Sequence, residues 1–373
     1  MLSGRSNWSA AVNRLTLAKE ERRRSGGEII DLTVSNPTHA AIDYPLDELS
    51  DAMSRGSRAP YDPQPLGIPS ARAAVAAQIG CDPADVIITA STSEAYSFLF
   101  KLLCDPGDAV LTATPSYPLI EQLAALELIE MRSFALELHA RWELDAAEAR
   151  AALTPKTKAV VVINPNNPTG SYIRLDEQEA LAGLGLPIIS DEVLFDYHFA
   201  GERRTFVRDD VLTFTLGGLS KSAGLPHFKL GWIRIGGPEV QRRRAIDALE
   251  VIADNFLSVS TPVQEALPDL LRIGASVRER IRTRTGENLA HLRGAMPRSV
   301  SVLPVEGGWT AVLRVPRISS DDDLAIALLE RGVLVQPGYF FDFERDGYIV
   351  VSLLTPPEAF VDGLRRISEA MMR

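Results

Sequence analysis

The sequence predicts an α/β fold in which a mainly parallel sheet carries helices on both faces. Apolar runs typical of strands alternate with helical stretches from about residue 85 to residue 235, and this alternation is typical of a parallel sheet. Polar and charged residues follow several of those runs, at the edge where open α/β sheets bind ligands. A chain of 373 residues is also long enough for one large and one small domain.

Composition and charge narrow the class of protein. The chain is 46% hydrophobic and 24% charged, which is typical of a globular protein, and its net charge of -10 argues against a nucleic acid or an anionic membrane as partner. Its apolar runs are too short to span a membrane and residues 1–13 are too polar for a signal peptide, so we expect a cytoplasmic protein. The two cysteines and five histidines show no metal-ligand spacing, and we predict no metal.

A helix, a short strand and two turns or loops are predicted before the alternating region. Apolar positions at helical spacing predict a helix within Trp8–Ser25, and Ile29–Leu32 reads as a short strand that leads into a turn containing Asn36. Tyr61 lies in a proline-rich loop that ends at Gly67, where an aromatic residue is by itself most often a packing anchor.

The first strand of the alternating region, Val86–Thr89, ends in Ser91-Thr92-Ser93-Glu94. Ser91 and Glu94 have the spacing of a capping box, so a helix begins there. Capping alone would explain the hydroxyls, but a helix N-terminus at the carboxyl end of a strand is also an anion-binding site, because its N–H groups are free.

Four further strands end in candidate residues. The strand near Ala109–Leu111 leads to Tyr117, and the buried strand Lys158–Asn164 leads to the loop Asn164-Pro165-Asn166-Asn167-Pro168-Thr169-Gly170. The strand before Asp191 ends in an acid that needs a partner if it is buried. An apolar run, Val211–Leu216, leads to Leu219-Ser220-Lys221-Ser222, and further along to Lys229, Gly231 and Trp232. An isolated lysine would most often be a solvated surface charge.

Together these segments resemble the class I/II aminotransferases, which are fold-type I pyridoxal-phosphate enzymes, over a stretch from Asn36 to Tyr348. The resemblance implies a large domain with a mainly parallel seven-stranded sheet flanked by helices, and a smaller α+β domain. We place the large cofactor-binding domain at residues 46–272 and the small domain at residues 1–45 and 273–373. Beyond the alternating region the sequence predicts a helix over Ile273–Gly294, strands at Thr310–Val315 and Tyr348–Leu354, and a helix from Asp321.

The resemblance also implies a role for each candidate residue. Lys221 would form a Schiff base with pyridoxal 5'-phosphate and move the substrate Cα proton, while Asp191 would keep the ring nitrogen protonated. Tyr117 would stack on the ring, and Asn167 would bind the ring oxygen. Asn167 and Asn36 would both lie near the substrate. The phosphate would be held by Thr92, Ser93, Ser220 and Lys229, and by Tyr61 reaching across a homodimer interface.

The sequence departs from the family pattern at four positions. Lys229 replaces an arginine and Gly218 replaces a serine at the phosphate, so we expect a slightly weaker hold on the cofactor. Leu194 stands where a tyrosine contacts the ring oxygen, and Val350 stands where an arginine binds the substrate α-carboxylate. We therefore expect an aminotransferase with atypical substrate recognition, one that suits a larger or less charged amino donor beside Trp309, Tyr339, Phe340 and Phe341.

Two other functions are compatible with parts of this pattern. A pyridoxal-phosphate lyase, racemase or cyclase in a specialised biosynthetic pathway would use the same lysine. A transcriptional regulator with an aminotransferase-like domain would need a DNA-binding domain, and only about 30 residues precede the turn at Asn36, fewer than a domain needs.

Overall fold

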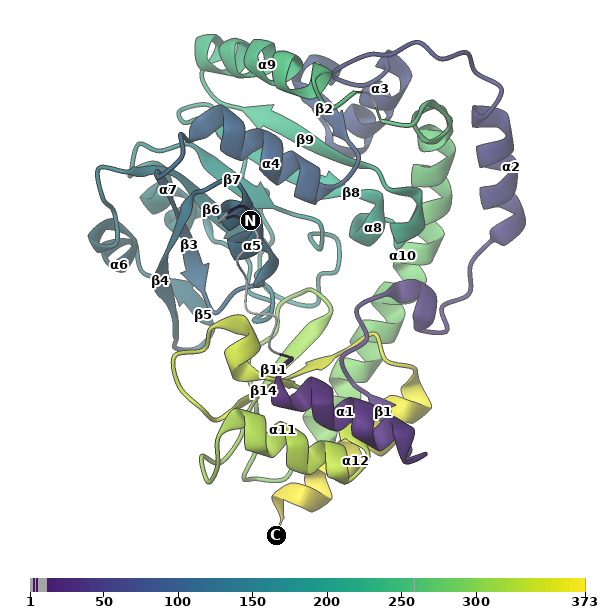
Figure 1. Ribbon diagram of the computed structural model, residues 1–373, viewed down its shortest axis with the longest axis vertical. Helices are drawn as coiled ribbons and strands as arrows, with labels where there is room; N and C mark the ends of the chain where they lie inside the picture. The colour runs from purple at the N-terminus through teal and green to yellow at the C-terminus, as the bar shows by residue number, and fades with distance from the viewer. Residues whose placement is uncertain (1–2, 4, 6–11, 258, 373) are drawn as a thin grey trace.

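The computed structural model describes residues 3, 5, 12–257 and 259–372. A larger lobe and a smaller lobe are joined by one long helix, which runs along the side of the molecule in Figure 1. The first helix, α1, covers Arg14–Arg24 with Asn13 as its N-cap; the part of the predicted helix from Trp8 to Ala11 lies outside the described residues.

The larger lobe is built on one sheet with the strand order β2-β9-β8-β7-β6-β3-β4-β5. Neighbouring strands from β8 to β4 are parallel, β9 is antiparallel to both β8 and β2, and β5 is antiparallel to β4. This confirms the mainly parallel α/β sheet; its first seven strands in this order form the predicted sheet, and the short β5 extends its edge. The bounds are β2 (Val86–Thr89), β3 (Ala109–Thr114), β4 (Glu130–Leu138), β5 (Trp142–Leu144), β6 (Thr157–Ile163), β7 (Ile188–Asp191), β8 (Thr213–Gly218) and β9 (Gly231–Gly236).

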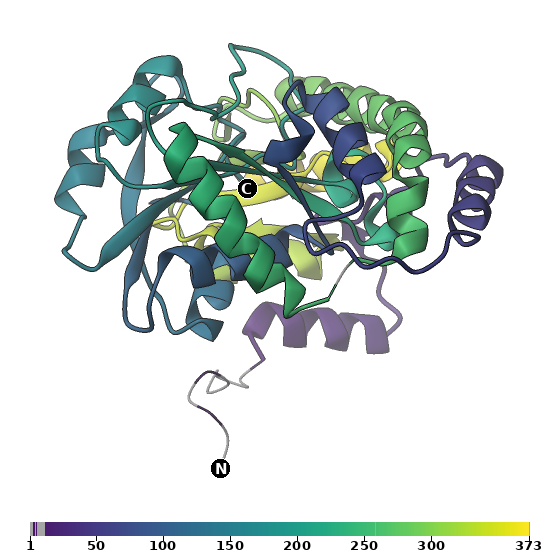
Figure 2. The same ribbon diagram turned by 90° about the horizontal axis from the view of Figure 1, so that it is seen from above.

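Helices cover both faces of this sheet, as the view from above shows (Figure 2). The residues of β6 alternate between two cores: Ala159, Val161 and Ile163 join one, and Val160 and Val162 join the other. This is why the strand is apolar at every position rather than at every second one. The first core is closed by α4 (Thr92–Leu103), α5 (Leu119–Leu126) and α9 (Glu239–Asp254), and the second by α6 (Ala146–Ala151) and α7 (Leu175–Ala182).

The connecting helix α10 is longer than the sequence predicts. It runs unbroken over Thr261–Ala295, so the predicted start at Ile273 is wrong by about three turns. Pro268 lies inside it, at a cost of about 3 kcal/mol in an isolated helix. The buried stripe that includes Leu267, Leu270 and Ile273 packs with α2 (Leu46–Gly56) and α3 (Pro69–Ile79), and that burial outweighs the local cost.

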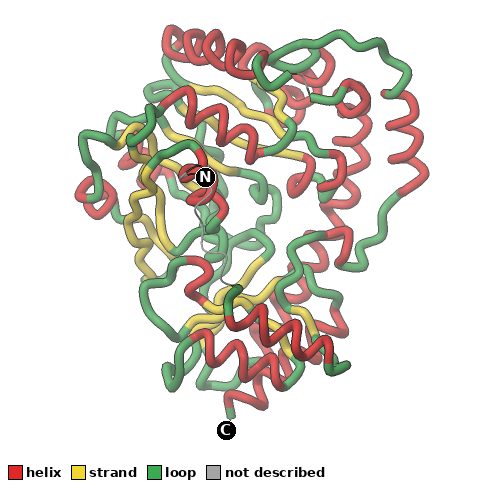
Figure 3. Tube along the Cα trace, in the orientation of Figure 1, coloured by secondary structure: helices red, strands yellow, loops and turns green. Residues whose placement is uncertain are grey.

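The smaller lobe contains a four-stranded sheet with helices packed on it (Figure 3). Its strand order is β10-β11-β14-β13, and all of its pairs are antiparallel. A separate parallel pair joins β1 near the start of the chain to β12, so the N-terminal arm packs with the C-terminal part. The bounds are β1 (Ile30–Asp31), β10 (Ser301–Val302), β11 (Thr310–Arg314), α11 (Asp321–Glu330), β12 (Val333–Leu334), β13 (Gln336–Pro337), β14 (Tyr348–Ser352) and α12 (Pro357–Met371).

The division into residues 46–272 against 1–45 and 273–373 stays a proposal, since α10 passes through its second boundary. Within the described part of the chain, no helix is both long enough and apolar enough to cross a membrane. The same residues contain no group of three or more histidine, cysteine or acidic side chains arranged to hold a metal ion.

Candidate active site

A cavity of about 360 Å³ lies where the carboxyl ends of the large sheet's parallel strands face the small lobe. Of the candidate residues, eight line it: Thr92, Ser93, Tyr117, Asn167, Asp191, Ser220, Lys221 and Lys229. They come from several elements of the large lobe: Thr92 and Ser93 begin α4, Ser220 and Lys221 lie on the short helix after β8, and Asp191 ends β7. Residues far apart in the sequence therefore meet at the edge where the parallel strands end. Tyr61 and Asn36 do not line the cavity.

Lys221 lies on α8 (Leu219–Ser222), a short helix that follows β8 directly. Its Nζ donates a hydrogen bond to the backbone oxygen of Ser35 at 2.9 Å and lies 4.8 Å from the centroid of the Trp309 ring. Burial lowers the pKa of Lys221 to about 8, although the negative charge of Asp191 acts in the opposite direction. The amine is therefore held in place and is more easily deprotonated than a surface lysine.

The lowered pKa predicts a measurable pH dependence in the cofactor-free protein. Labelling of Lys221 by an amine-directed reagent should have its midpoint near pH 8, whereas the ordinary lysine value is 10.5. Between these two values the folded state binds fewer protons than the unfolded state, so this group's contribution to the free energy of unfolding rises with pH. Mass spectrometry of labelled peptides across pH 6–11 checks the midpoint, with Lys156 as the exposed control; a common midpoint for both lysines would contradict it.

Asp191 ends β7, and both of its carboxylate oxygens have donors within the protein. Oδ2 accepts a hydrogen bond from the Tyr96 hydroxyl at 3.1 Å and Oδ1 accepts one from the Val193 N–H at 3.2 Å. Burial raises the pKa of Asp191 to about 6, while these donors and Lys221 act to lower it. The carboxylate thus stays mainly ionised at neutral pH in a buried place, which is a costly arrangement unless a cationic partner is supplied.

Tyr96 is a site residue that the sequence reasoning missed. It lies on α4, one helical turn after Thr92, and it also lines the cavity. Burial raises the pKa of its hydroxyl well above 10, so it remains a donor to Asp191. The spacing of four residues from Thr92 was the available signal.

The start of α4 forms a group of uncommitted hydrogen-bond donors. Ser91 caps the helix by accepting from the Glu94 N–H at 3.1 Å, as predicted, and the Glu94 carboxylate accepts from the Ala90 N–H. The N–H groups and hydroxyls of Thr92 and Ser93 have no hydrogen-bond partner in the described part of the chain. Lys229 and Ser220 line the same cavity, so this region is suited to a phosphate.

The loop after β6 is tied down by Asn166, which leaves Asn167 free to line the cavity. Asn166 accepts from the N–H and hydroxyl of Thr169 and donates to the Pro115 oxygen. Gly170 closes the loop with φ +73°, where a Cβ would come within 2.5 Å of the Gly307 oxygen, so only glycine fits. Asn167 accepts a long contact of 3.5 Å from the Thr310 hydroxyl, and its Nδ2 has no partner among the described residues.

The two candidate residues outside the cavity lie elsewhere. Asn36 accepts hydrogen bonds from the N–H and hydroxyl of Thr38 and so caps a 3₁₀ turn, Pro37–His39. Tyr61 is 70% exposed on the loop between α2 and α3. The substrate role of Asn36 and the phosphate role of Tyr61 stay predictions.

The structure also shows where two of the positions that depart from the family pattern lie. Leu194 lines the cavity, whereas Val350 is fully buried and packs with Val312 and Phe341 behind it. The Tyr197 hydroxyl donates a hydrogen bond to the backbone oxygen of Lys221 at 2.6 Å and therefore helps to fix the backbone that carries the lysine.

The expected aromatic surround is present only in part. Trp309 and Phe341 line the cavity, but Tyr339 and Phe340 do not. Tyr339 is 42% exposed and donates to Asp322, and its ring packs edge-on against Phe340. The 3₁₀ turn Gly338–Phe341 directs successive side chains to different sides, so a sequence run of aromatics does not make one surface.

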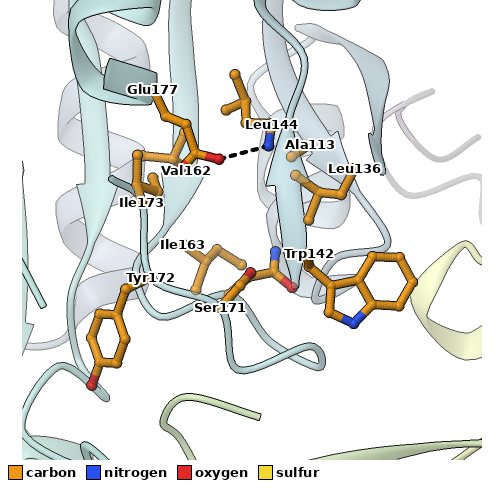
Figure 4. A pocket seen from close by; sticks show the side chains of 11 residues that line it. Ala113, Leu136, Trp142, Leu144, Val162, Ile163, Ser171, Tyr172, Ile173 and Glu177 are labelled. Atoms are coloured by element: carbon orange, nitrogen blue, oxygen red, sulfur yellow. Dashed lines mark hydrogen bonds between the residues drawn. The ribbon is translucent and has the colours of Figure 1, made fainter. Parts of the chain in front are cut away.

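A second cavity lies between β4, β6 and the loop after β6, and Figure 4 shows its lining. Its volume is about 20 Å³, which is room for a water molecule but not for a substrate. Glu177 accepts a hydrogen bond from the Leu144 N–H at 2.9 Å in its wall. Its role is structural packing.

The residues present fit pyridoxal phosphate. Uncommitted donors and a lysine suit its phosphate, Asp191 suits its protonated ring nitrogen, and the Lys221 amine suits its aldehyde. An α/β sheet with this set at its carboxyl edge defines a pyridoxal-phosphate-dependent transferase. The chain belongs to the class I and II aminotransferases, whose family model matches residues 27–359.

Comparisons with known proteins agree with this assignment. The chain is 27% identical to a nicotianamine aminotransferase of Oryza sativa subsp. japonica, over 88% of this chain and 71% of that protein. It is 32% identical to an S-alkyl-thiohydroximate lyase of Arabidopsis thaliana, over 60% of this chain and 52% of that protein. The fold is that of an alanine aminotransferase from Pyrococcus furiosus, with a TM-score of 0.91, 24% identity and complete coverage of both chains.

Proposed function

We propose that this enzyme transfers an amino group from an amino acid or related amine to a 2-oxo acid, and that its substrate recognition is atypical. The observation that carries the proposal is the Lys221 amine, held in the cavity beside Asp191 with its pKa lowered to about 8. Transamination needs a base that can both take and return a proton, and a pKa near neutrality serves both steps.

The residues of the chain divide the work as follows. Pyridoxal phosphate, when bound, supplies an aldehyde for the substrate amine and a ring that withdraws electrons from Cα. Lys221 would take the proton from the substrate Cα and return it to a carbon of the cofactor. Ser35 and Tyr197 hold the lysine in place through hydrogen bonds to its amine and to its backbone oxygen. Asp191 holds the proton on the ring nitrogen, and Tyr96 orients Asp191.

The atypical recognition rests on Val350. The resemblance places an arginine for the substrate α-carboxylate at this position, and here the side chain is apolar and fully buried. No arginine lines the cavity within the described residues; its two cations are Lys221 and Lys229. A buried carboxylate without a cationic partner is unfavourable, which supports a donor that is larger or less charged than the common amino acids.

A different reaction on the same scaffold is the second candidate. The sequence similarity to a lyase favours it, because elimination would use the same lysine. The two are separated by incubating the enzyme with a panel of amines and pyruvate or 2-oxoglutarate. Amino-group transfer to the oxo acid, with recovery of an oxo product from the donor, supports transamination; cleavage of the donor without any transfer would contradict it.

A homodimer is part of the proposal. The resemblance implies that Tyr61 reaches the phosphate of a second subunit, and its 70% exposure and its position outside this chain's cavity lining are compatible with that role. We expect Tyr61→Phe to weaken cofactor affinity about tenfold or more, because a hydrogen bond to a charged phosphate is lost. Sedimentation velocity and cofactor titration check this; a fully active monomer in wild type would refute it.

We also propose a cytoplasmic location.

A further inference from the structure

The charged residues that line the active-site cavity all come from the large lobe. Asp191 ends β7, and Lys221 and Lys229 lie on the segment that joins β8 to β9. The residues that the small lobe and the N-terminal arm contribute to the described lining carry no charge: Thr33, Val34, Ser35, Trp309, Thr310, Gln336, Phe341 and Ser352. One wall of the cavity, which we call the neutral wall, is therefore made of these eight residues.

Three residues of the neutral wall have little contact with solvent. Trp309, Phe341 and Ser352 are each at most 4% exposed. A carboxylate placed against such a surface loses its water without gaining a cation, and that loss is large. A neutral polar group loses less, and it recovers the loss with a single good hydrogen bond.

Three polar side-chain groups of this wall have no hydrogen-bond partner among the described residues and are free to make that bond: the Gln336 amide, the Ser35 hydroxyl and the Trp309 indole N–H. Of these, the Gln336 amide is the group that belongs to the cross-strand partner of Val350. The hydroxyl of Thr310 donates to the Pro168 oxygen at 3.0 Å, and that of Ser352 donates to the Val34 oxygen. The Thr33 hydroxyl donates to Asp31. The amide of Gln336 has no hydrogen-bond partner in the part of the chain that the structure describes, and it lines the cavity.

The register of the small sheet explains why the free amide lies there. Gln336 of β13 is the cross-strand partner of Val350 of β14, and Val350 in turn faces Val312 of β11. Cross-strand partners point to the same face of a sheet. Gln336 is thus the polar group next to Val350 on the face that forms the neutral wall.

We propose that Gln336 is the substrate-recognition residue, and that the preferred amino donor carries an uncharged hydrogen-bonding group, such as an amide, ester or hydroxymethyl group, beside the amine-bearing carbon. The primary amide of Gln336 offers two donors and one acceptor, so it matches such a group. It can also donate to the carboxylate of a 2-oxo acid at lower affinity, so one cavity serves both half-reactions. This inference rests on the proposed aminotransferase function.

The test compares the binding of 2-aminoisobutyramide and 2-aminoisobutyrate to the cofactor-loaded enzyme by calorimetry. Neither ligand has a hydrogen on its amine-bearing carbon, so affinity is measured without transamination. We expect the amide to bind at least about tenfold more tightly in wild type. Gln336→Leu should remove most of that advantage, and the control Gln241→Leu, on the exposed face of α9, should keep it.

A second variant reverses the preference. Val350→Arg places a cation beside Gln336, so the ratio of acid affinity to amide affinity should rise at least about tenfold relative to wild type. The amines of the two ligands differ in basicity. Comparing the affinity ratio of the variant with that of the wild type cancels this difference. If Val350→Arg does not fold, Gln336→Leu decides.

Equal or tighter binding of the acid in wild type, or no change in Gln336→Leu, would overturn the inference. The proposed function is judged separately, by amino-group transfer to a 2-oxo acid. An enzyme that performs this transfer and prefers the free acid would keep its function and lose only the neutral-substrate assignment.

Discussion

Replacing Lys221 with alanine should lower the rate of Cα-proton loss by about 10⁴-fold or more. The Lys221 amine lies in the cavity, hydrogen-bonded to the Ser35 oxygen, and is the proposed base for the transfer. The other amine of the described lining belongs to Lys229. The substitution should also remove the covalent attachment of the cofactor. We expect the variant to fold, since removing a buried amine with a lowered pKa relieves an unfavourable burial.

Borohydride reduction followed by peptide mass spectrometry measures the attachment directly. Wild-type protein should be yellow, lose that colour on reduction and carry the label on Lys221. Lys156→Ala, at an exposed position outside the cavity, is the control and should keep full labelling and activity. A label on any lysine other than Lys221 would overturn the central assignment.

Replacing Asp191 with alanine should leave cofactor binding partly intact and slow Cα-proton loss by about 10²–10³-fold. The reason is electrostatic: without a carboxylate the ring nitrogen loses its proton, and the ring then withdraws fewer electrons from Cα. The carboxylate is buried, and it is held in place by the Tyr96 hydroxyl and the Val193 N–H, which both donate to it. Stopped-flow absorbance with a deuterated donor isolates the proton-loss step.

Two further variants separate the charge of Asp191 from its packing. Asp191→Asn keeps the shape and loses the charge, so it should resemble Asp191→Ala in rate. Tyr96→Phe removes the 3.1 Å hydrogen bond to Oδ2 and keeps the ring, so its effect should be smaller, on the order of tenfold. Near-normal turnover in Asp191→Ala would mean that the acid is structural, as Glu192 is.

Glu192 shows what a structural acid looks like in this fold. It is buried next to Asp191 in the sequence, but it accepts hydrogen bonds from Asn164, Ser190, Thr205 and Phe206. These four donors satisfy both of its oxygens within the large lobe, and it does not line the cavity. The two acids are adjacent in the chain, but their surroundings differ: Asp191 lines the cavity and Glu192 is enclosed by these four donors.

The local pattern of the sequence determined the large sheet and most of the cavity lining. Apolar runs such as Lys158–Asn164 are buried on both faces only in a parallel sheet, and such a sheet brings the ends of its strands to one edge. The sequence alone therefore predicts that Thr92, Asn167, Asp191 and Lys221 lie close together, and all four line the cavity. The phosphate, ring and substrate roles came from the resemblance and remain to be tested residue by residue.

Contacts between distant segments decided the rest. The continuous α10 depends on α2 and α3 burying its apolar stripe, and local propensity at Pro268 argues against it. Tyr96 reaches Asp191 because the fold brings α4 close to the end of β7. Gln336 lies beside Val350 because of the register of two short strands, and two-residue strands such as β13 leave no alternation for the sequence to reveal. Secondary structure follows from periodicity along the chain, whereas substrate recognition follows from which strands pair, and that is a property of the folded molecule.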